Sequence, residues 1–378
     1  VDPEVAELMM KYYVESYGNP SSVHSFGREV KKAVEEARSQ VASIIGANPN
    51  EIIFTSGGTE ADNLAIQGAA RARANKGRHL ITSAIEHHAV LDTFKYLAKN
   101  GFELTILPVD SEGLVSVEEV KKAIRPDTIL ISVMHANNEI GSIQPIEEIG
   151  EIAREHGIIF HVDAVQSLGK IPIDVQKMNI DLLSLSSHKI YGPKGVGALY
   201  IRKGIKILPL VFGGAQERKM RSGTENAPGI IGFGKACELA AQRMAEDNKK
   251  LIRLRDKLID GILSNIEEVR LNGPRGDKRL PNNVNVCIRY IEGESLLLSL
   301  DMLGIAASSG SACTSGSLDP SHVLLAIGLP HEIAHGSLRF SLGRQNTDEE
   351  IDFVIQELPK IVNRLREMSP LYNKKLSS

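Results

Sequence analysis

Residues 181–197 read DLLSLSSHKIYGPKGVG and join a short apolar strand to a loop of small residues. The leucines at 182, 183 and 185 predict the strand, and the loop carries one lysine, Lys189, before glycines and a proline. A lysine held at the end of a strand in a dry, polar pocket is suited to Schiff-base chemistry with a carbonyl cofactor. A lone lysine is more often a solvated loop residue, so the interpretation depends on the rest of the chain.

The same pattern of strand, small-residue loop and helix extends outward from this stretch, over residues 51–201. Such alternation predicts an α/β fold with a mostly parallel sheet and with ligands at the carboxyl ends of its strands. We predict strands at 51–55, 79–82, 103–107, 128–133, 158–162, 181–185 and 196–201, and helices at 61–74, 89–100, 116–124 and 146–156.

The pattern changes after about residue 229. A long helix is predicted over 230–266, followed by strands at 284–288 and 337–342 and by helices at 294–301 and 348–368. These elements predict a second, smaller α+β domain. We place the large domain at 16–248 and the small domain at 1–15 and 249–378.

Composition narrows the classes of function. The 378 residues suffice for two domains, and the net charge of −3 argues against a nucleic-acid or membrane surface. The sequence shows no apolar run of transmembrane length and no basic-then-apolar leader. The cysteines at 237, 287 and 313 have no CxxC spacing, which favours a reducing compartment over a disulfide framework. We therefore expect a cytoplasmic protein.

Two positions suit the phosphate and the ring of a cofactor. Gly58 and Thr59 lie where a strand runs into a helix, and free amides at a helix start bind phosphate. Simple capping of the helix by Thr59 is the alternative. His87 ends the next strand and could stack on a planar ring or move protons, although a lone histidine is more often structural.

Further polar residues follow the later strands. Asp163 ends a hydrophobic strand, where a carboxylate is costly unless it meets a cation such as a protonated pyridine nitrogen. Gln166, one turn further on, could reach a ring oxygen. Asn138 can donate to and accept from a heteroatom, and it could equally be a turn residue. For Asp163 the alternative is a helix cap.

The second half of the chain adds three candidates. The segment Arg221-Ser-Gly-Thr224 offers phosphate donors, and Arg339 could clamp a carboxylate or make a surface ion pair. Cys237 lies in a predicted helix and Cys287 in a predicted strand, so we expect both to be small core residues. Cys313 lies in a Ser/Gly-rich loop, where a thiol is suited to reactivity.

Taken together, these motifs resemble one family, the pyridoxal-phosphate-dependent cysteine desulfurases of the IscS/NifS type. The members of this family have the aspartate-aminotransferase fold (class V aminotransferase-like), which is a PLP-dependent transferase fold. The matching segments span nearly the whole chain and are Gly18-Asn-Pro-Ser, Ser56-Gly-Gly-Thr-Glu-Ala-Asp-Asn63, Glu86-His87, Asn137-Asn-Glu-Ile-Gly141, His161-Val-Asp-Ala-Val-Gln166, Ser187-His-Lys-Ile-Tyr-Gly-Pro-Lys-Gly195, Arg221-Ser-Gly-Thr224, Ser308-Ser-Gly-Ser-Ala-Cys-Thr-Ser315 and Arg339-Phe-Ser-Leu-Gly343. The cysteine loop is similar to that of the long-loop subgroup.

The resemblance implies a role for each matching residue. Lys189 would hold the cofactor as a Schiff base, Asp163 would hold the ring proton, and Cys313 would attack the substrate sulfur. His87 would stack on the ring and serve in catalysis. The other cofactor contacts would be Gly58, Thr59, Asn138, Gln166, Ser186, His188 and, from the other subunit, Thr224. Asn138 and Arg339 would bind the substrate carboxylate.

The resemblance also implies partners. Converting L-cysteine to L-alanine would leave a persulfide on Cys313, whose sulfur would pass to an IscU-type scaffold or another acceptor for iron–sulfur cluster assembly. Cys313 could then be a transient ligand of a [2Fe-2S] cluster shared with that scaffold, and the enzyme would be a homodimer. Selenocysteine lyase, a related aminotransferase and a catalytically weak assembly partner are the alternatives.

Two features depart from the family pattern. Members usually have a strand and an Asn/Asp-rich turn ahead of the position that matches Val1, and we expect that piece to border the active site. The family also commonly has Gly or Ala where Ser187 stands.

Overall fold

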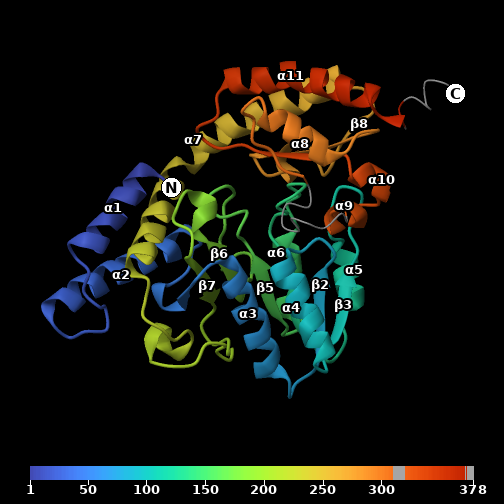
Figure 1. Ribbon diagram of the computed structural model, residues 1–378. Helices are drawn as coiled ribbons and strands as arrows, with labels where there is room; N and C mark the ends of the chain where they lie inside the picture. Colours follow the sequence, from blue (N-terminus) through green and yellow to red (C-terminus); the bar gives the residue numbers. More distant parts are fainter. Residues whose placement is uncertain (310–319, 371, 373–378) are drawn as a thin grey trace. The chain divides into compact units, whose positions relative to one another are not determined.

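The structure is a computed structural model that describes residues 1–309, 320–370 and 372 (Figure 1). The chain forms two compact units. The first unit consists of residues 1–107, 115–136 and 144–244, and the second unit consists of residues 108–114, 137–143 and 245–378. None of the helices in these described ranges is long and apolar enough to cross a membrane.

A seven-stranded sheet forms the centre of the first unit, with the strand order β1-β7-β6-β5-β4-β2-β3. Its strands are β1 (Ile52–Thr55), β2 (His79–Ser83), β3 (Glu103–Leu107), β4 (Thr128–Ser132), β5 (Ile159–Asp163), β6 (Leu182–Ser186) and β7 (Gly197–Ile201). Strands β3, β2, β4, β5 and β6 are parallel, and β7 runs antiparallel to both of its neighbours. The predicted α/β class with a mostly parallel sheet is confirmed.

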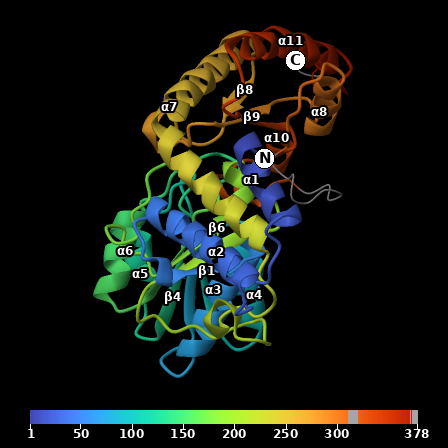
Figure 2. The ribbon, with the colours of Figure 1, turned by 90° about the vertical axis from the view of Figure 1, so that its left-hand side faces the viewer.

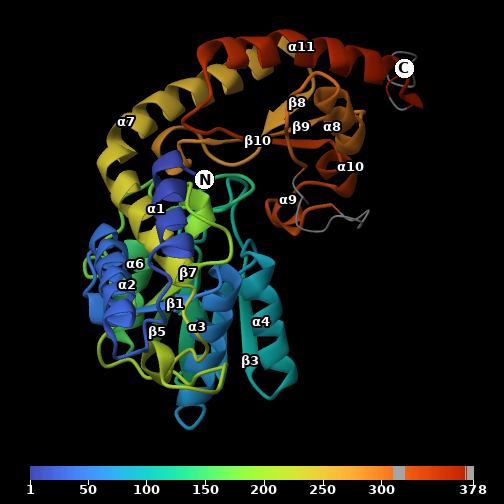
Figure 3. The ribbon, with the colours of Figure 1, turned by 60° about the vertical axis from the view of Figure 1, so that its left-hand side comes forward.

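Helices cover both faces of this sheet. The helices of the first unit are α1 (Pro3–Val14), α2 (Ser25–Ile44), α3 (Gly58–Arg73), α4 (His88–Lys99), α5 (Val117–Ala123), α6 (Ile146–Glu155) and the first part of α7 (Ala227–Asn265). Figure 3 shows α3 and α4 on one side of the sheet and α2, α6 and α7 on the other. The alanine-rich face of α3 and the branched residues of the strands form the core between them.

The amino-terminal helices pack against α7 (Figure 2). A Cβ added at Gly232 of α7 would lie 2.6 Å from Sδ of Met9, and one added at Gly234 would lie 2.5 Å from Cα of Ala37. These glycines therefore let α7 approach both helices closely. The Asp2 carboxylate also pairs with Arg243 at 3.0 Å. Residues 1–15, which we expected in the small domain, thus belong to the first unit.

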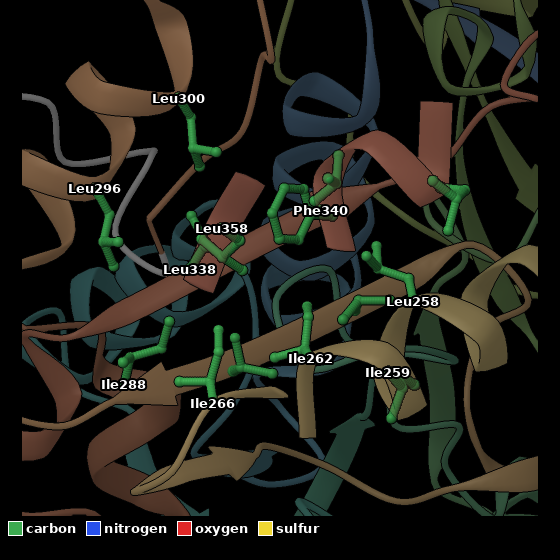
Figure 4. Close-up of a cluster of buried hydrophobic side chains, with 14 of the residues drawn as sticks. Leu258, Ile259, Ile262, Ile266, Ile288, Leu296, Leu300, Leu338, Phe340 and Leu358 are labelled. Carbon is green, nitrogen blue, oxygen red and sulfur yellow. The ribbon is translucent and has the colours of Figure 1, made fainter. Parts of the chain in front are cut away.

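A three-stranded antiparallel sheet with the order β10-β9-β8 forms the centre of the second unit. Its elements are β8 (Val269–Leu271), β9 (Asn283–Ile288), β10 (Ser337–Ser341), α8 (Gly293–Asp301), α9 (His322–Ala326), α10 (His331–Ala334), α11 (Asp348–Glu367) and the second part of α7. Leucine and isoleucine side chains from α7, α8, β9, β10 and α11 pack into one core (Figure 4).

Short 3₁₀ helices occur in both units. They are η1 (Pro49–Glu51), η2 (Ser187–Ile190) and η3 (Gln216–Lys219) in the first unit and η4 (Gly276–Lys278) in the second.

The division into units differs from the expected domain boundaries in a second respect. The segments 108–114 and 137–143 group with the second unit although they connect elements of the first. Hydrogen bonds explain this grouping: the N–H of Ile143 donates to Lys278 and that of Leu280 donates to Gly141, while Oγ of Ser142 donates to the backbone oxygen of Gly113. Asn138 is therefore described with the second unit.

Candidate active site

Lys189 lies in η2, the single turn that follows strand β6, and is partly buried. The turn ends at Tyr191, which has a left-handed φ of 64°. A Cβ at Gly192, the next residue, would lie only 2.0 Å from Oγ of Ser187. Glycine is thus required there, and the tight turn fixes where the lysine side chain begins.

Asp163 ends β5, the strand next to β6, and is buried. Its Oδ1 accepts a hydrogen bond of 2.9 Å from the backbone N–H of Val165. Burial raises the pKa of Asp163 to about 6, and the positive charge of Lys189 acts in the opposite direction. Asp163 at the end of β5 and Lys189 just after β6 thus come from neighbouring strands, and the lysine charge acts on the buried carboxyl.

The first turn of α3 lies against both of these strand ends. A Cβ at Gly58 would lie 2.7 Å from Cγ2 of Val165 and 3.7 Å from Cβ of Ser186, so only a glycine fits without movement. The preceding Gly57 has no side chain that could cap the helix. The amides of this first turn are therefore suited to an anion, with the exposed Thr59 beside them.

His87 is the N-cap residue of α4 and is partly buried. Its Nδ1 accepts a 3.1 Å hydrogen bond from the N–H of Ala89, so the neutral ring carries its proton on Nε2. Gln166 is partly buried just after β5, and the exposed His188 precedes Lys189. Burial lowers the pKa of His188, as do the charges of nearby lysines.

Thr224 is exposed, in a segment of the first unit that precedes α7. The neighbouring Arg221 forms an ion pair of 2.8 Å with Glu60 in the first turn of α3. The structure therefore links this segment to α3 through Arg221. The structure places Gly58, Ser186, Asp163 and Lys189 at the same end of the sheet.

Two predicted residues meet in the second unit. Nη1 of Arg339, on β10, donates to the backbone oxygen of Asn138 at 3.1 Å. Nε of Arg339 is buried and has no hydrogen-bond partner among the described residues. A buried, unpaired donor of this kind is suited to an incoming carboxylate.

The cysteines divide as the sequence suggests. Cys237 and Cys287 are buried, and burial raises the pKa of both thiols, that of Cys287 to about 11. Neither is suited to act as a nucleophile. Cys313 lies outside the described residues. Within the described ranges, no group of three or more His, Cys, Asp or Glu residues could hold a metal ion.

Sequence reasoning missed Glu86 as a separate feature. Its carboxylate is fully buried and accepts hydrogen bonds from Oγ of Ser83 and, at 2.9 Å, from the N–H of Met134. Burial raises its pKa to about 8, and the charge of Asp163 adds to the rise. An acidic residue three positions after the end of β2, next to the apolar Ile85, was the available signal.

Comparison with known proteins places the chain in a family. The family model described as aminotransferase class V matches residues 1–354. The chain belongs to this family. It is 61% identical over 371 residues to proteins named cysteine desulfurase IscS from Clostridium botulinum strain Hall and from Methanosarcina thermophila. These matches cover 98% of the chain and 94% and 91% of those proteins.

Solved structures agree with this assignment to the class V aminotransferases. A structure titled NifS-like protein superposes with a TM-score of 0.91 at 42% identity and covers 97% of both chains. A NifS-like protein from Rickettsia africae superposes with a TM-score of 0.87 at 33% identity and covers 96% of both chains. The chain thus belongs with the cysteine desulfurases of the class V aminotransferase family, a family that depends on pyridoxal phosphate.

The site residues of this class V aminotransferase fit that cofactor. A buried carboxylate with a raised pKa, such as Asp163, requires a cation, which a protonated pyridine ring supplies. The uncapped start of α3 at Gly58 fits a phosphate group. The partly buried Lys189 supplies the amine.

We expect Glu86→Gln to change the pH dependence of stability. Below pH 4.5 the carboxyl of Glu86 is protonated whether the chain is folded or unfolded. Between pH 4.5 and about 8 only the unfolded chain releases this proton, so Glu86 lowers the free energy of unfolding as pH rises. The slope is about 1.4 kcal/mol per pH unit, and glutamine removes it.

Thermal unfolding from pH 5 to 7.5 measures this effect. The Tm of Glu86→Gln should rise relative to that of the wild-type protein at each higher pH. Glu151→Gln, at an exposed position of α6, serves as the control and should follow the wild-type curve. Parallel curves for Glu86→Gln and the wild-type protein would contradict the raised pKa.

Proposed function

We propose that this protein is a pyridoxal-phosphate-dependent cysteine desulfurase that converts L-cysteine to L-alanine and retains the sulfur as a persulfide on Cys313. One observation carries the proposal: the buried carboxylate of Asp163 faces the charge of Lys189 at the strand ends where the uncapped helix α3 begins. The 61% identity to proteins named cysteine desulfurase supports this choice of reaction.

Each residue of the first unit has a task in this proposal. Bound pyridoxal phosphate supplies an electron sink. Asp163 holds the proton on the ring nitrogen, and Lys189 binds the cofactor covalently and moves protons. His87 would stack on the ring, and its Nε2, which carries the proton in the neutral ring, would exchange that proton. The remaining cofactor contacts in this unit would be Gly58, Thr59, Gln166, Ser186, His188 and a partner subunit's copy of Thr224.

The second unit supplies substrate binding. The unpaired Nε of Arg339, with Asn138, binds the carboxylate of L-cysteine. The thiolate of Cys313 then attacks the substrate sulfur, so that an S–S bond forms and the C–S bond breaks. The electron pair of that bond stays on carbon, which takes up a proton and becomes the methyl group of alanine.

We further propose that the enzyme is a cytoplasmic homodimer that passes its sulfur to an IscU-type scaffold or another acceptor. Large apolar side chains exposed on one copy support a second copy as partner, among them Tyr17 at 77% exposure, Val23 at 88% and Phe212 at 82%. On the scaffold, Cys313 would serve as a transient ligand of a shared [2Fe-2S] cluster.

The purified protein with pyridoxal phosphate and L-cysteine tests the proposed reaction. Alanine and protein-bound persulfide should form in equal amounts in a single turnover without reductant, and alanine should continue to form once dithiothreitol releases the sulfur as sulfide. L-Selenocysteine as a parallel substrate identifies a lyase, which would favour selenium over sulfur. Absence of alanine from L-cysteine would contradict the proposal.

A further inference from the structure

Three asparagines, Asn272, Asn283 and Asn285, are buried in or beside the three-stranded sheet of the second unit. Asn283 and Asn285 lie on β9, and Asn272 directly follows β8. Oδ1 of Asn285 accepts a hydrogen bond of 2.7 Å from Nδ2 of Asn272, which also donates to Sγ of Cys287 at 3.1 Å. A buried amide side chain is costly unless it is hydrogen-bonded, and the proposed reaction gives none of these asparagines a task.

Two of these amides hold one carbonyl group of the backbone. Nδ2 of Asn283 and Nδ2 of Asn285 both donate to the backbone oxygen of Glu139, at 2.9 and 3.0 Å. Oδ1 of Asn283 accepts from Nη1 of the buried Arg279 at 3.0 Å, so both amide oxygens face donors and both nitrogens point to Glu139. The carboxylate of Glu139 is held as well, since it accepts a hydrogen bond from Oγ of Ser321.

Arg339 holds the preceding carbonyl group. It lies directly opposite Asn285 in the antiparallel register of β9 and β10, so the two side chains project from the same face of the sheet. Nη1 of Arg339 donates to the backbone oxygen of Asn138 at 3.1 Å. The successive carbonyl groups of Asn138 and Glu139 are therefore held by neighbouring side chains of one small sheet.

The segment that contains these two carbonyl groups is a tight turn. Oδ1 of Asn137 accepts hydrogen bonds from the N–H groups of Glu139 and Ile140, at 2.8 and 2.9 Å. Of residues 137–142, all of which the structure describes, Asn138 alone is not buried. The turn and the two held carbonyl groups thus fix the backbone from which the side chain of Asn138 projects.

We propose that Asn285 is a positioning residue for the substrate carboxylate. Its amide, together with that of Asn283, holds the backbone of Glu139 against β9. This contact keeps Asn138 and Arg339 at the separation in which both reach one carboxylate. The inference deepens the proposed function and rests on it, because only a ligand with a carboxylate uses the two residues together. An apolar side chain of the same size at position 285 would fill the space but release the carbonyl group.

Three leucine variants of similar size separate positioning from stability. Asn285→Leu removes one donor to Glu139, and Asn283→Leu removes the other, so each gives the test if its counterpart does not fold. Asn272→Leu is the matched control, because it breaks the same amide network at a buried position but leaves both donors to Glu139 in place. Unfolding temperatures should fall in all three variants, so a change that they share reports stability alone.

L-Alanine and L-alaninamide are the probes, because the second lacks only the carboxylate. Each is added to the protein loaded with pyridoxal phosphate, and the change in cofactor absorbance gives its Kd without any cleavage of a C–S bond. The wild-type protein should prefer L-alanine. Asn285→Leu and Asn283→Leu should each reduce this preference about fivefold, the effect of one lost hydrogen bond, whereas Asn272→Leu should keep it within about twofold.

Kinetics with L-cysteine give a second readout. Asn285→Leu should raise KM about fivefold and keep kcat within about twofold of the wild-type value, since Lys189 and Asp163 are untouched. An unchanged preference for L-alanine in Asn285→Leu, or an equal loss in Asn272→Leu, would overturn the positioning role.

The probes also distinguish this inference from the proposed function. A wild-type protein that binds L-alanine and L-alaninamide equally has no carboxylate site at Arg339, and the positioning role of Asn285 then fails with that site. A wild-type protein that prefers L-alanine but forms no alanine from L-cysteine is not a desulfurase. In that case the preference measured in Asn285→Leu still decides whether Asn285 positions the carboxylate site.

Discussion

Lys189→Ala should abolish turnover of L-cysteine and the visible absorbance of the covalently held cofactor. The amine is the group that binds the carbonyl of pyridoxal phosphate, and it is also the proposed proton carrier. Loss of both functions should lower kcat by at least about 10³-fold. Absorbance after dialysis and alanine release measure the two effects on one sample.

Two further variants control this result. Lys189→Arg keeps the positive charge that opposes the rise in the pKa of Asp163, and it should be as inactive as Lys189→Ala. Lys194→Ala removes an exposed lysine of the same loop and should retain activity and absorbance. A Lys189→Ala protein that keeps its visible band after dialysis would show that another amine holds the cofactor.

The sheet was predictable because apolar runs end abruptly at small or polar residues. The strand predicted at 103–107 is β3, and the strand predicted at 128–133 is one residue longer than β4. Helix α2 could also have been predicted, since Val30, Val34, Ala37 and Val41 recur at helical spacing. Helix α1 could not be predicted in this way, because only one of its residues, Val5, is buried, so no apolar face recurs at helical spacing.

The first-unit site residues were predictable for a related reason. Asp163 ends β5 and Lys189 follows the neighbouring parallel strand β6, so local sequence places both at one edge of the sheet. The contact between Glu139 and Ser321 is different, since 182 residues separate them and neither has a local signal. Tertiary packing alone turns this glutamate into a buried acid. The grouping of segment 137–143 with the second unit follows from the same packing.

Cys313→Ser should keep the absorbance of the bound cofactor and lose persulfide and sulfide formation from L-cysteine by at least about 10³-fold. Lys189 and Asp163 are untouched in this variant, so the cofactor binds as before. Serine oxygen cannot accept the substrate sulfur as a persulfide, since the acceptor must be a thiolate. Mass spectrometry of the intact protein after one turnover measures the effect, because a persulfide adds the mass of one sulfur atom, ~32 Da.

Cys237→Ala is the matched control, because that thiol is fully buried and its pKa is raised. It should lose some stability through the small cavity and should still form the persulfide. Because Cys237 and Cys287 are both buried, a persulfide that persists in Cys313→Ser would require one of them to become accessible. Retained sulfide release in Cys313→Ser would therefore contradict the assignment of Cys313 and redirect the search for the acceptor to the substrate thiol itself.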